Sequence, residues 1–173
     1  MIQMISIADL HPHKDNPRKD LGDLSELTES IKVNGIFQNL TVTPRPEGGY
    51  TVIIGHRRME AARLAGLTEL PCAVVDMDER TQLSTMLLEN MQRSDLTTYE
   101  QAQGFQLMFD LGMSAEEISD KSGFAVSTVK KRLKIATLPA DDLRAAMDRG
   151  GTLEQYIAIS EIKSEKERKK LLE

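Results

Sequence analysis

Patterns typical of β-strands occur only in the first half of the chain, and this asymmetry limits the folds that the chain can adopt. Short runs of β-branched and apolar residues lie at 40–44 (LTVTP), 50–54 (YTVII) and 70–75 (LPCAVV). From Asp78 onward these runs vanish, and apolar residues recur at helical spacing. The sequence therefore predicts an α+β domain followed by an all-α domain.

Helix start and stop residues lie between these strands. Asp23, with Glu26 three residues later, can cap a helix that ends at Gly35. A second helix is expected from about His56 to Ala65. Strands and helices therefore interleave in the first domain.

The second half has the spacing of capped helices. Two pairs match a capping box: Thr98 with Gln101, and Ser114 with Glu117. The polar stretch RSDLTT at 93–98 interrupts the apolar pattern. We therefore predict two domains, 1–95 and 96–173.

Charge is distributed unevenly. The chain has 22 Lys and Arg against 27 Asp and Glu, and its formal net charge of −5 argues against a protein that coats nucleic acid indiscriminately. Yet the segment 121–134 contains cations and no acid. Its cations are Lys121, Lys130, Lys131, Arg132 and Lys134. This segment indicates a localised site for an anionic partner.

Other residue types argue against several classes of protein. The single cysteine, Cys72, cannot form an internal disulfide and is expected in the core, and the three histidines have no metal-ligand spacing. No apolar run reaches about 18 residues, and no signal peptide is recognisable at the start. We expect a cytoplasmic protein without a membrane partner.

The basic segment lies within a pattern typical of a helix–turn–helix at about 114–135. A short helix carries Ile118 inward, Gly123 permits a tight turn, and a second helix presents Val129 and Leu133 on one face. Polar residues on the other face of that helix could enter a DNA major groove. They are Ser127, Thr128, Lys130, Lys131 and Lys134. The alternative is an ordinary helical hairpin with a solvated cationic face.

A second candidate site lies at 53–58, where IIGHRR passes from a strand to a basic helix start. Gly55 permits a tight turn, and unpaired N–H groups at a helix start attract anions. Arg57 and Arg58 would add bidentate charge for a phosphate, and Arg57 is expected to stay solvated without a ligand. The alternative is a structural turn followed by exposed basic residues.

Several stretches occur in a characteristic series: GIFQNLTVTP at 35–44, GHRRMEAARLAGLTELPCAVV at 55–75, LLENMQRSDLTTYEQA at 87–102, and then the helix–turn–helix. In this order they resemble the ParB family of chromosome and plasmid partition proteins, from about Ile7 to about Ile162. The family's G-E-R-R-x-x-A box corresponds to GHRRMEA at 55–61, and its E-N-x-x-R box to ENMQR at 89–93.

The resemblance implies a ParB/sulfiredoxin-like first domain and a CTP-dependent clamp on double-stranded DNA with a parS-like site. It also implies a homodimer, a ParA-type ATPase as a further partner, a nucleoid-associated location and at most slow CTP hydrolysis. In such proteins the nucleotide lies between the two boxes. The matching positions are Gln38, Gly55, His56, Arg57, Arg58, Glu89, Asn90 and Arg93. Among these, Glu89 and Asn90 would hold Mg²⁺, which prefers oxygen ligands.

The chain departs from the family pattern at several positions. His56 replaces the usual glutamate and Asn39 the usual proline, so nucleotide affinity and base choice can differ from the family norm. Ala125 and Val126 stand where the family often has Ser-Arg, which leaves the DNA target open. Glu89 and Arg93 are also spaced i, i+4, and an intrahelical ion pair would explain them equally well.

Other functions remain compatible with parts of this pattern. A ParB-like transcriptional regulator or a nucleoid-occlusion-type protein would carry the same two domains without a partition role. A sulfiredoxin is disfavoured because its nucleotide turn has a cysteine where this chain has Gly55. A ParB-like nuclease would need a two-metal carboxylate cluster, which the spacing does not suggest. We expect any C-terminal dimerisation domain to lie outside this sequence.

Overall fold

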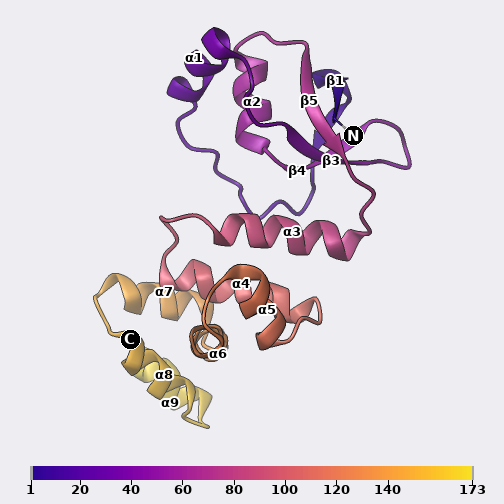
Figure 1. Cartoon of the computed structure of the whole chain (residues 1–173). Helices are drawn as coiled ribbons and strands as arrows, with labels where there is room; N and C mark the ends of the chain where they lie inside the picture. The colour runs from indigo at the N-terminus through magenta and orange to yellow at the C-terminus, as the bar shows by residue number, and fades with distance from the viewer. Residues whose placement is uncertain (1, 173) are drawn as a thin grey trace. The chain divides into compact units, whose positions relative to one another are not determined.

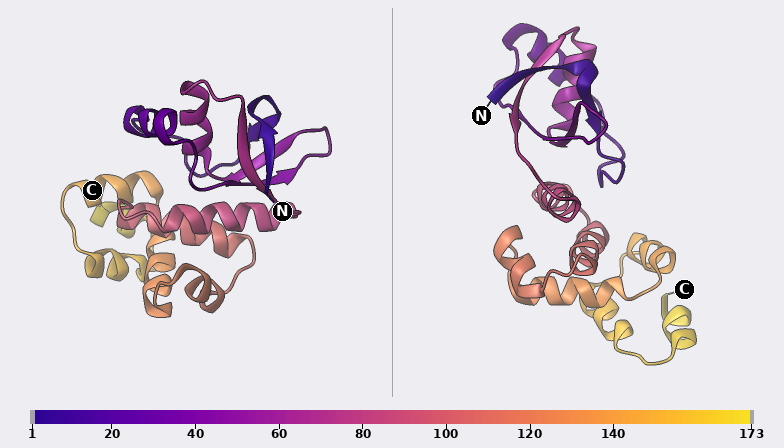
Figure 2. Two further views of the ribbon diagram at one scale, coloured as in Figure 1. Left: turned by 45° about the horizontal axis from the view of Figure 1, so that its top comes forward. Right: turned by 90° about the vertical axis from the view of Figure 1, so that its right-hand side faces the viewer.

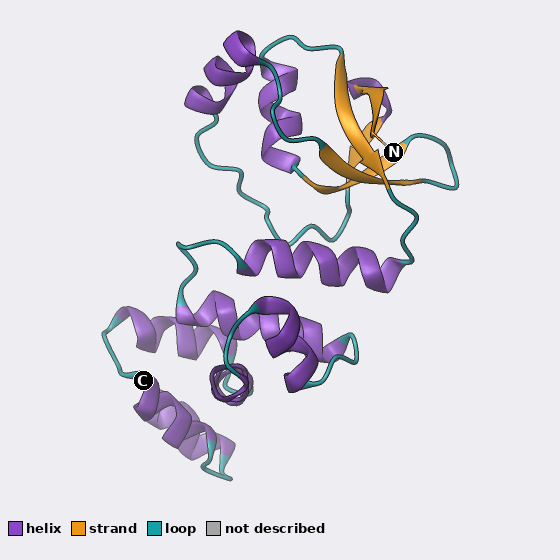
Figure 3. Ribbon diagram, viewed as in Figure 1, coloured by secondary structure: helices purple, strands orange, loops and turns teal. Residues whose placement is uncertain are grey.

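The computed structural model describes residues 2–172, and its contacts divide the chain into two compact units. The first unit runs to Asn90 and combines strands with helices, whereas the second begins at Met91 and is built from helices (Figures 1 and 3). The predicted order, an α+β domain and then a helical one, is confirmed. The boundary at residue 95 stays a prediction, because contacts within one folded chain do not test which segment folds alone.

A mixed sheet organises the first unit. Its strands are β1 (Ile2–Ser6), β2 (Leu10–Pro12), β3 (Leu40–Pro44), β4 (Tyr50–Ile54) and β5 (Glu69–Val74). They lie in the order β1-β5-β3-β4-β2, with β1/β5 and β3/β4 antiparallel and β3/β5 and β2/β4 parallel. The sequence patterns missed β1 and β2, which η1 (Ile7–Asp9) joins. Both are edge strands, and only Ile5 and Leu10 among their residues are buried, so they lack a clear alternation.

Two helices cover one face of this sheet. α1 (Ser25–Asn34) and α2 (His56–Leu64) lie side by side in Figures 1 and 2 and contact each other. Ile31 and Ala61 from these helices join the buried residues of β3, β4 and β5 in one apolar core. Cys72 is fully buried in the same core, and burial raises the pKa of its thiol to about 11. Its predicted place in the core is confirmed.

Beyond β5, the regular elements of the described chain are helices. They are α3 (Glu79–Met91), α4 (Thr98–Asp110), α5 (Ala115–Ser122), α6 (Val126–Ala136), α7 (Ala140–Asp148), α8 (Leu153–Ser160) and α9 (Glu165–Leu172). In the second unit α6 packs closely on α4, and Ala102, Ile135 and Leu143 belong to its core. Within residues 2–172, no helix is long and apolar enough to cross a membrane.

Two of the predicted helix caps need correction. Asp23 does not close a box with Glu26, because its Oδ1 accepts a hydrogen bond from the Ser25 N–H at 2.9 Å. The capping box of α4 is formed by Thr97 and Glu100, one residue earlier than predicted. A carboxylate is favoured over an amide beside the positive end of the helix dipole. The predicted box at 114–117 is present.

We predict that Gly55→Ala destabilises the first unit more than Gly66→Ala. Both glycines have positive φ, 107° and 82°, but a Cβ on Gly55 would lie 2.9 Å from Leu40 Cγ, whereas a Cβ on Gly66 meets nothing within 4 Å. Gly66→Ala should cost about 1–2 kcal/mol of unfolding free energy from backbone strain. Gly55→Ala should cost about 2–4 kcal/mol because overpacking adds to that strain. Chemical denaturation of both variants measures the difference, and equal losses would contradict it.

Candidate functional site

Gly55 joins β4 to α2 in a left-handed conformation, with φ 107° and ψ 23°. The Met59 N–H donates to its carbonyl at 2.9 Å and closes the first turn of α2. The N–H groups that precede Met59 in the helix have no intrahelical acceptor and can face an anion. The backbone of this turn therefore has the geometry that the sequence predicted.

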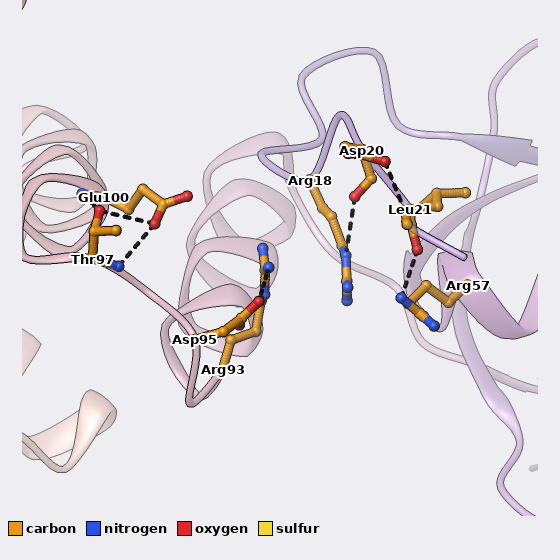
Figure 4. Close-up of polar contacts among 9 residues, drawn as sticks. Arg18, Asp20, Leu21, Arg57, Arg93, Asp95, Thr97 and Glu100 are labelled. Atoms are coloured by element: carbon orange, nitrogen blue, oxygen red, sulfur yellow. Dashed lines mark hydrogen bonds and ion pairs between the residues drawn. The ribbon is translucent and has the colours of Figure 1, made fainter. Parts of the chain in front are cut away.

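Arg57 is partly exposed, but its guanidinium also bonds to the protein, which was not expected from the sequence. Its Nη1 donates to the Leu21 carbonyl at 2.6 Å (Figure 4). Its Nη2 donates to the Asp23 carbonyl at 3.0 Å. These partners could not be predicted from the sequence, because every residue has a backbone carbonyl and no residue type identifies the one that is used. Arg57 thus ties the loop before α1 to the start of α2.

Arg58 makes the corresponding contact with a second segment. Its Nη1 donates to the Gln38 carbonyl at 2.6 Å and to the Asn39 carbonyl at 2.9 Å. Burial lowers the pKa of this guanidinium, and the nearby Glu89 carboxylate partly offsets the effect. The structure therefore gathers the Gln38 segment, the glycine turn and Glu89 of α3 around one cation.

His56 contributes no charge at neutral pH. Burial, reinforced by the neighbouring His13, lowers the pKa of His56 to about 4. Its Nε2 is buried and has no hydrogen-bond partner among the described residues. His13 is itself only 8% exposed, and its place beside His56 was not predicted, because the two residues are 43 positions apart in the sequence. The permanent positive charge of the turn thus comes from its two arginines.

The second family box, ENMQR at 89–93, has residues on both sides of the boundary between the two units. Glu89 is exposed in the last turn of α3, Asn90 ends the first unit, and Arg93 belongs to the second. Arg93 donates through Nε to Asp95 Oδ1 at 3.0 Å and through Nη2 to Oδ2 at 2.7 Å (Figure 4). Glu89, the i, i+4 partner of Arg93 considered from sequence, lies near enough to Arg58 to raise the pKa of that guanidinium.

The donor chemistry of this region is compatible with a magnesium nucleotide. No group of three or more His, Cys, Asp and Glu side chains that could hold a metal ion occurs within residues 2–172. Magnesium bound with a nucleotide needs fewer protein ligands, because phosphate oxygens and waters supply most of its shell. The Glu89 carboxylate and the Asn90 amide oxygen are of the right kind for such a shared site.

α5 and α6 form the predicted helix–turn–helix. Gly123 ends α5 with φ 79°, and Ile118 and Val129 are fully buried between the two helices and the rest of the unit. The Ser119 hydroxyl donates to the Phe124 carbonyl at 2.7 Å, which fixes the turn. The Phe124 ring packs edge-on against Phe105 of α4, with ring centroids 5.4 Å apart.

The cations of α6 differ in their surroundings. Lys130 Nζ lies 2.8 Å from Glu116 Oε1, and Lys134 Nζ lies 2.6 Å from Glu161 Oε1. Lys131 is exposed and has no ion-pair partner in the described part of the chain. Arg132 turns inward and donates to the Gln101 side chain of α4. Of the other two candidates, Ser127 is exposed and Thr128 partly buried.

Comparison with known proteins places these features in a family. Residues 1–91 match the family model described as the ParB N-terminal domain. The chain is 38% identical over 148 residues to the chromosome-partitioning protein Spo0J of Thermus thermophilus, covering 84% of this chain and 54% of that protein. It is also 38% identical over 141 residues to stage 0 sporulation protein J of Bacillus subtilis, covering 80% and 50%. The chain thus spans about half the length of these relatives.

Solved structures resemble the chain over almost its whole length. C-terminally truncated ParB from Caulobacter crescentus complexed to the centromeric parS site matches with a TM-score of 0.75 and 27% identity, covering 98% of this chain and 91% of that one. The same protein complexed with CTP-gamma-S matches with a TM-score of 0.51 and 28% identity, covering 100% and 99%. Together with the glycine turn, the second box and the helix–turn–helix, these matches show that the chain belongs to the ParB family of chromosome-partitioning proteins.

Proposed function

We propose that this chain is a CTP-dependent DNA clamp that acts in chromosome or plasmid partition. The observation that carries the proposal is the gathering of the Gln38 segment, the Gly55 turn and Glu89 around Arg58. The similarity to a ParB structure that holds CTP-gamma-S and to one that holds parS DNA supports both ligands.

In this proposal the turn binds the triphosphate. The glycine lets an anion approach the unpaired N–H groups of α2, and Arg57 and Arg58 donate to phosphate oxygens. Both guanidiniums now donate to neutral carbonyls, and a charged phosphate is the stronger acceptor. Nucleotide binding would then reposition the loops at 21–23 and 38–39. His56 would contact the nucleotide as a neutral ring.

The remaining nucleotide contacts follow the family resemblance. Gln38 and its segment would lie near the base, and Arg93 would be a further cation for the phosphates. Glu89 and Asn90 would hold Mg²⁺ together with phosphate oxygens, and the ion would neutralise charge between them.

The second unit would bind double-stranded DNA at a parS-like site through α6. Ser127, Thr128 and the outward lysines face away from the buried Val129 side of the helix, as a recognition helix requires. A clamp needs two copies of the chain, and two-fold association in the presence of CTP is the simplest closure. A ParA-type ATPase would be the further partner, and the assembly would be cytoplasmic and nucleoid-associated.

We predict that Arg57→Ala lowers CTP affinity about 30- to 150-fold, because a charge-assisted phosphate contact contributes on the order of 2–3 kcal/mol. The variant also loses its bonds to the Leu21 and Asp23 carbonyls, which should lower the unfolding free energy by about 1–2 kcal/mol. Calorimetric titration with CTP and thermal melting measure the two effects separately.

The control for Arg57→Ala is Arg63→Ala on the same helix. Arg63 is 64% exposed and pairs with Glu60 at 2.6 Å, so its loss should leave CTP affinity unchanged. If Arg57→Ala binds CTP as the parent does, or if it no longer melts cooperatively, the turn has a structural role and the nucleotide proposal fails.

We predict that Lys131→Ala weakens binding to duplex DNA more than Lys130→Ala. Lys131 has no ion pair in the described part of the chain, so it can contact DNA without breaking one. Lys130 must first break its ion pair with Glu116. The double variant should also flatten the dependence of affinity on salt by about one unit of log–log slope per lost phosphate contact. Fluorescence anisotropy at several salt concentrations measures both quantities.

Lys169→Ala, which removes an exposed lysine of α9, is the matched control for charge alone. It should leave DNA affinity and salt slope close to those of the parent. A double Lys130/Lys131 variant with unchanged affinity and slope would remove α6 from the DNA interface.

A further inference from the structure

Two of the three outward lysines of α6 already have carboxylate partners. Lys130 pairs with Glu116 in the first turn of α5, and Lys134 pairs with Glu161, which directly follows α8. The two carboxylates come from different elements of the second unit. Both lie against the face of α6 that is proposed to meet DNA.

We infer that Glu116 and Glu161 compete with DNA phosphates for Lys130 and Lys134, and that they thereby lower the affinity of this chain for any duplex. The inference rests on the proposed function, because it concerns DNA binding by α6. To contact a lysine, a phosphate must displace its carboxylate. The displaced carboxylate then stays near the phosphate as a like charge, which further weakens the complex.

The position of Glu116 suits it to this role. Glu116 lies at the N-terminal end of α5, where the helix dipole favours a negative charge, and the hydrogen bond from Lys130 lowers the pKa of its carboxyl. Its neighbour Glu117 is committed to the capping box with Ser114. Glu116 is therefore the carboxylate of this turn that is available to a lysine.

The strength of the pairs sets the size of the effect. The four side chains are 54–60% exposed, so each pair is screened by solvent. Exposed pairs of this kind change an equilibrium by no more than about fivefold. DNA can therefore displace both carboxylates, while each should still reduce affinity measurably.

This competition acts on one class of contact. Lysine–phosphate contacts are the same for every DNA sequence, whereas contacts to base edges distinguish sequences. Competition for Lys130 and Lys134 weakens the part of the binding free energy that is the same for every sequence. It leaves any base contacts of Ser127 or Thr128 unchanged. The two glutamates would thus raise the share of binding that depends on sequence.

The test uses the full chain, a short duplex of random sequence and anisotropy at several salt concentrations. Glu116→Gln and Glu161→Gln should each tighten binding about two- to fivefold at low salt and steepen the salt dependence. Glu165→Gln is the matched control, because it removes an exposed acid of α9 that has no ion pair within residues 2–172. It should change affinity by less than the other two variants.

A double-mutant cycle separates direct competition from a change in net charge. In a Lys134→Ala background, Glu161→Gln should have no more effect than Glu165→Gln, since the lysine that it occupies is gone. A gain that persists in that background, or a Glu161→Gln variant that equals the control in the parent background, would overturn the inference and leave DNA binding by α6 standing. If the parent chain binds no duplex, both the proposed function and the inference fail.

Discussion

Two neighbouring arginines at the start of α2 hold the loops around the glycine turn. Arg57 reaches the carbonyls at 21–23 and Arg58 those at 38–39, so two segments far apart in sequence depend on one helix start. The acceptors are neutral, and a bound phosphate would compete for the same donors. In the proposed function, the position of these loops would therefore depend on whether a nucleotide occupies the turn.

The cations of the second unit also have internal partners that a ligand would have to displace. The chain is acidic overall, but α6 presents Lys130, Lys131 and Lys134 on one face. Two of these lysines have carboxylate partners, which DNA phosphates would have to replace in the proposed complex. In both units, cations are thus bonded to internal acceptors, neutral carbonyls in the first unit and carboxylates in the second, in places where the proposed ligands would offer phosphate oxygens.

Local patterns in the sequence predicted the features that depend on neighbouring residues. The strands β3 to β5, the left-handed glycines at 55 and 123 and the helix–turn–helix all follow from spacing and turn chemistry. Partners distant in sequence could not be predicted in this way. The acceptors of Arg57 lie 34 and 36 residues away, and the partner of Lys134 lies 27 residues away, so both depend on how the elements pack. The edge strands were missed because few of their side chains are buried.

Calorimetric titration of CTP into the full chain, with and without a parS-like duplex, tests the central claim most directly, with ATP and GTP as controls. The account predicts that CTP binds in the presence of magnesium while the other two nucleotides do not. It also predicts that DNA changes the affinity for CTP, since coupling between two ligands of one switch is reciprocal. A chain that binds no CTP, or that binds all three nucleotides alike with and without DNA, would contradict the assignment of the glycine turn as a nucleotide site.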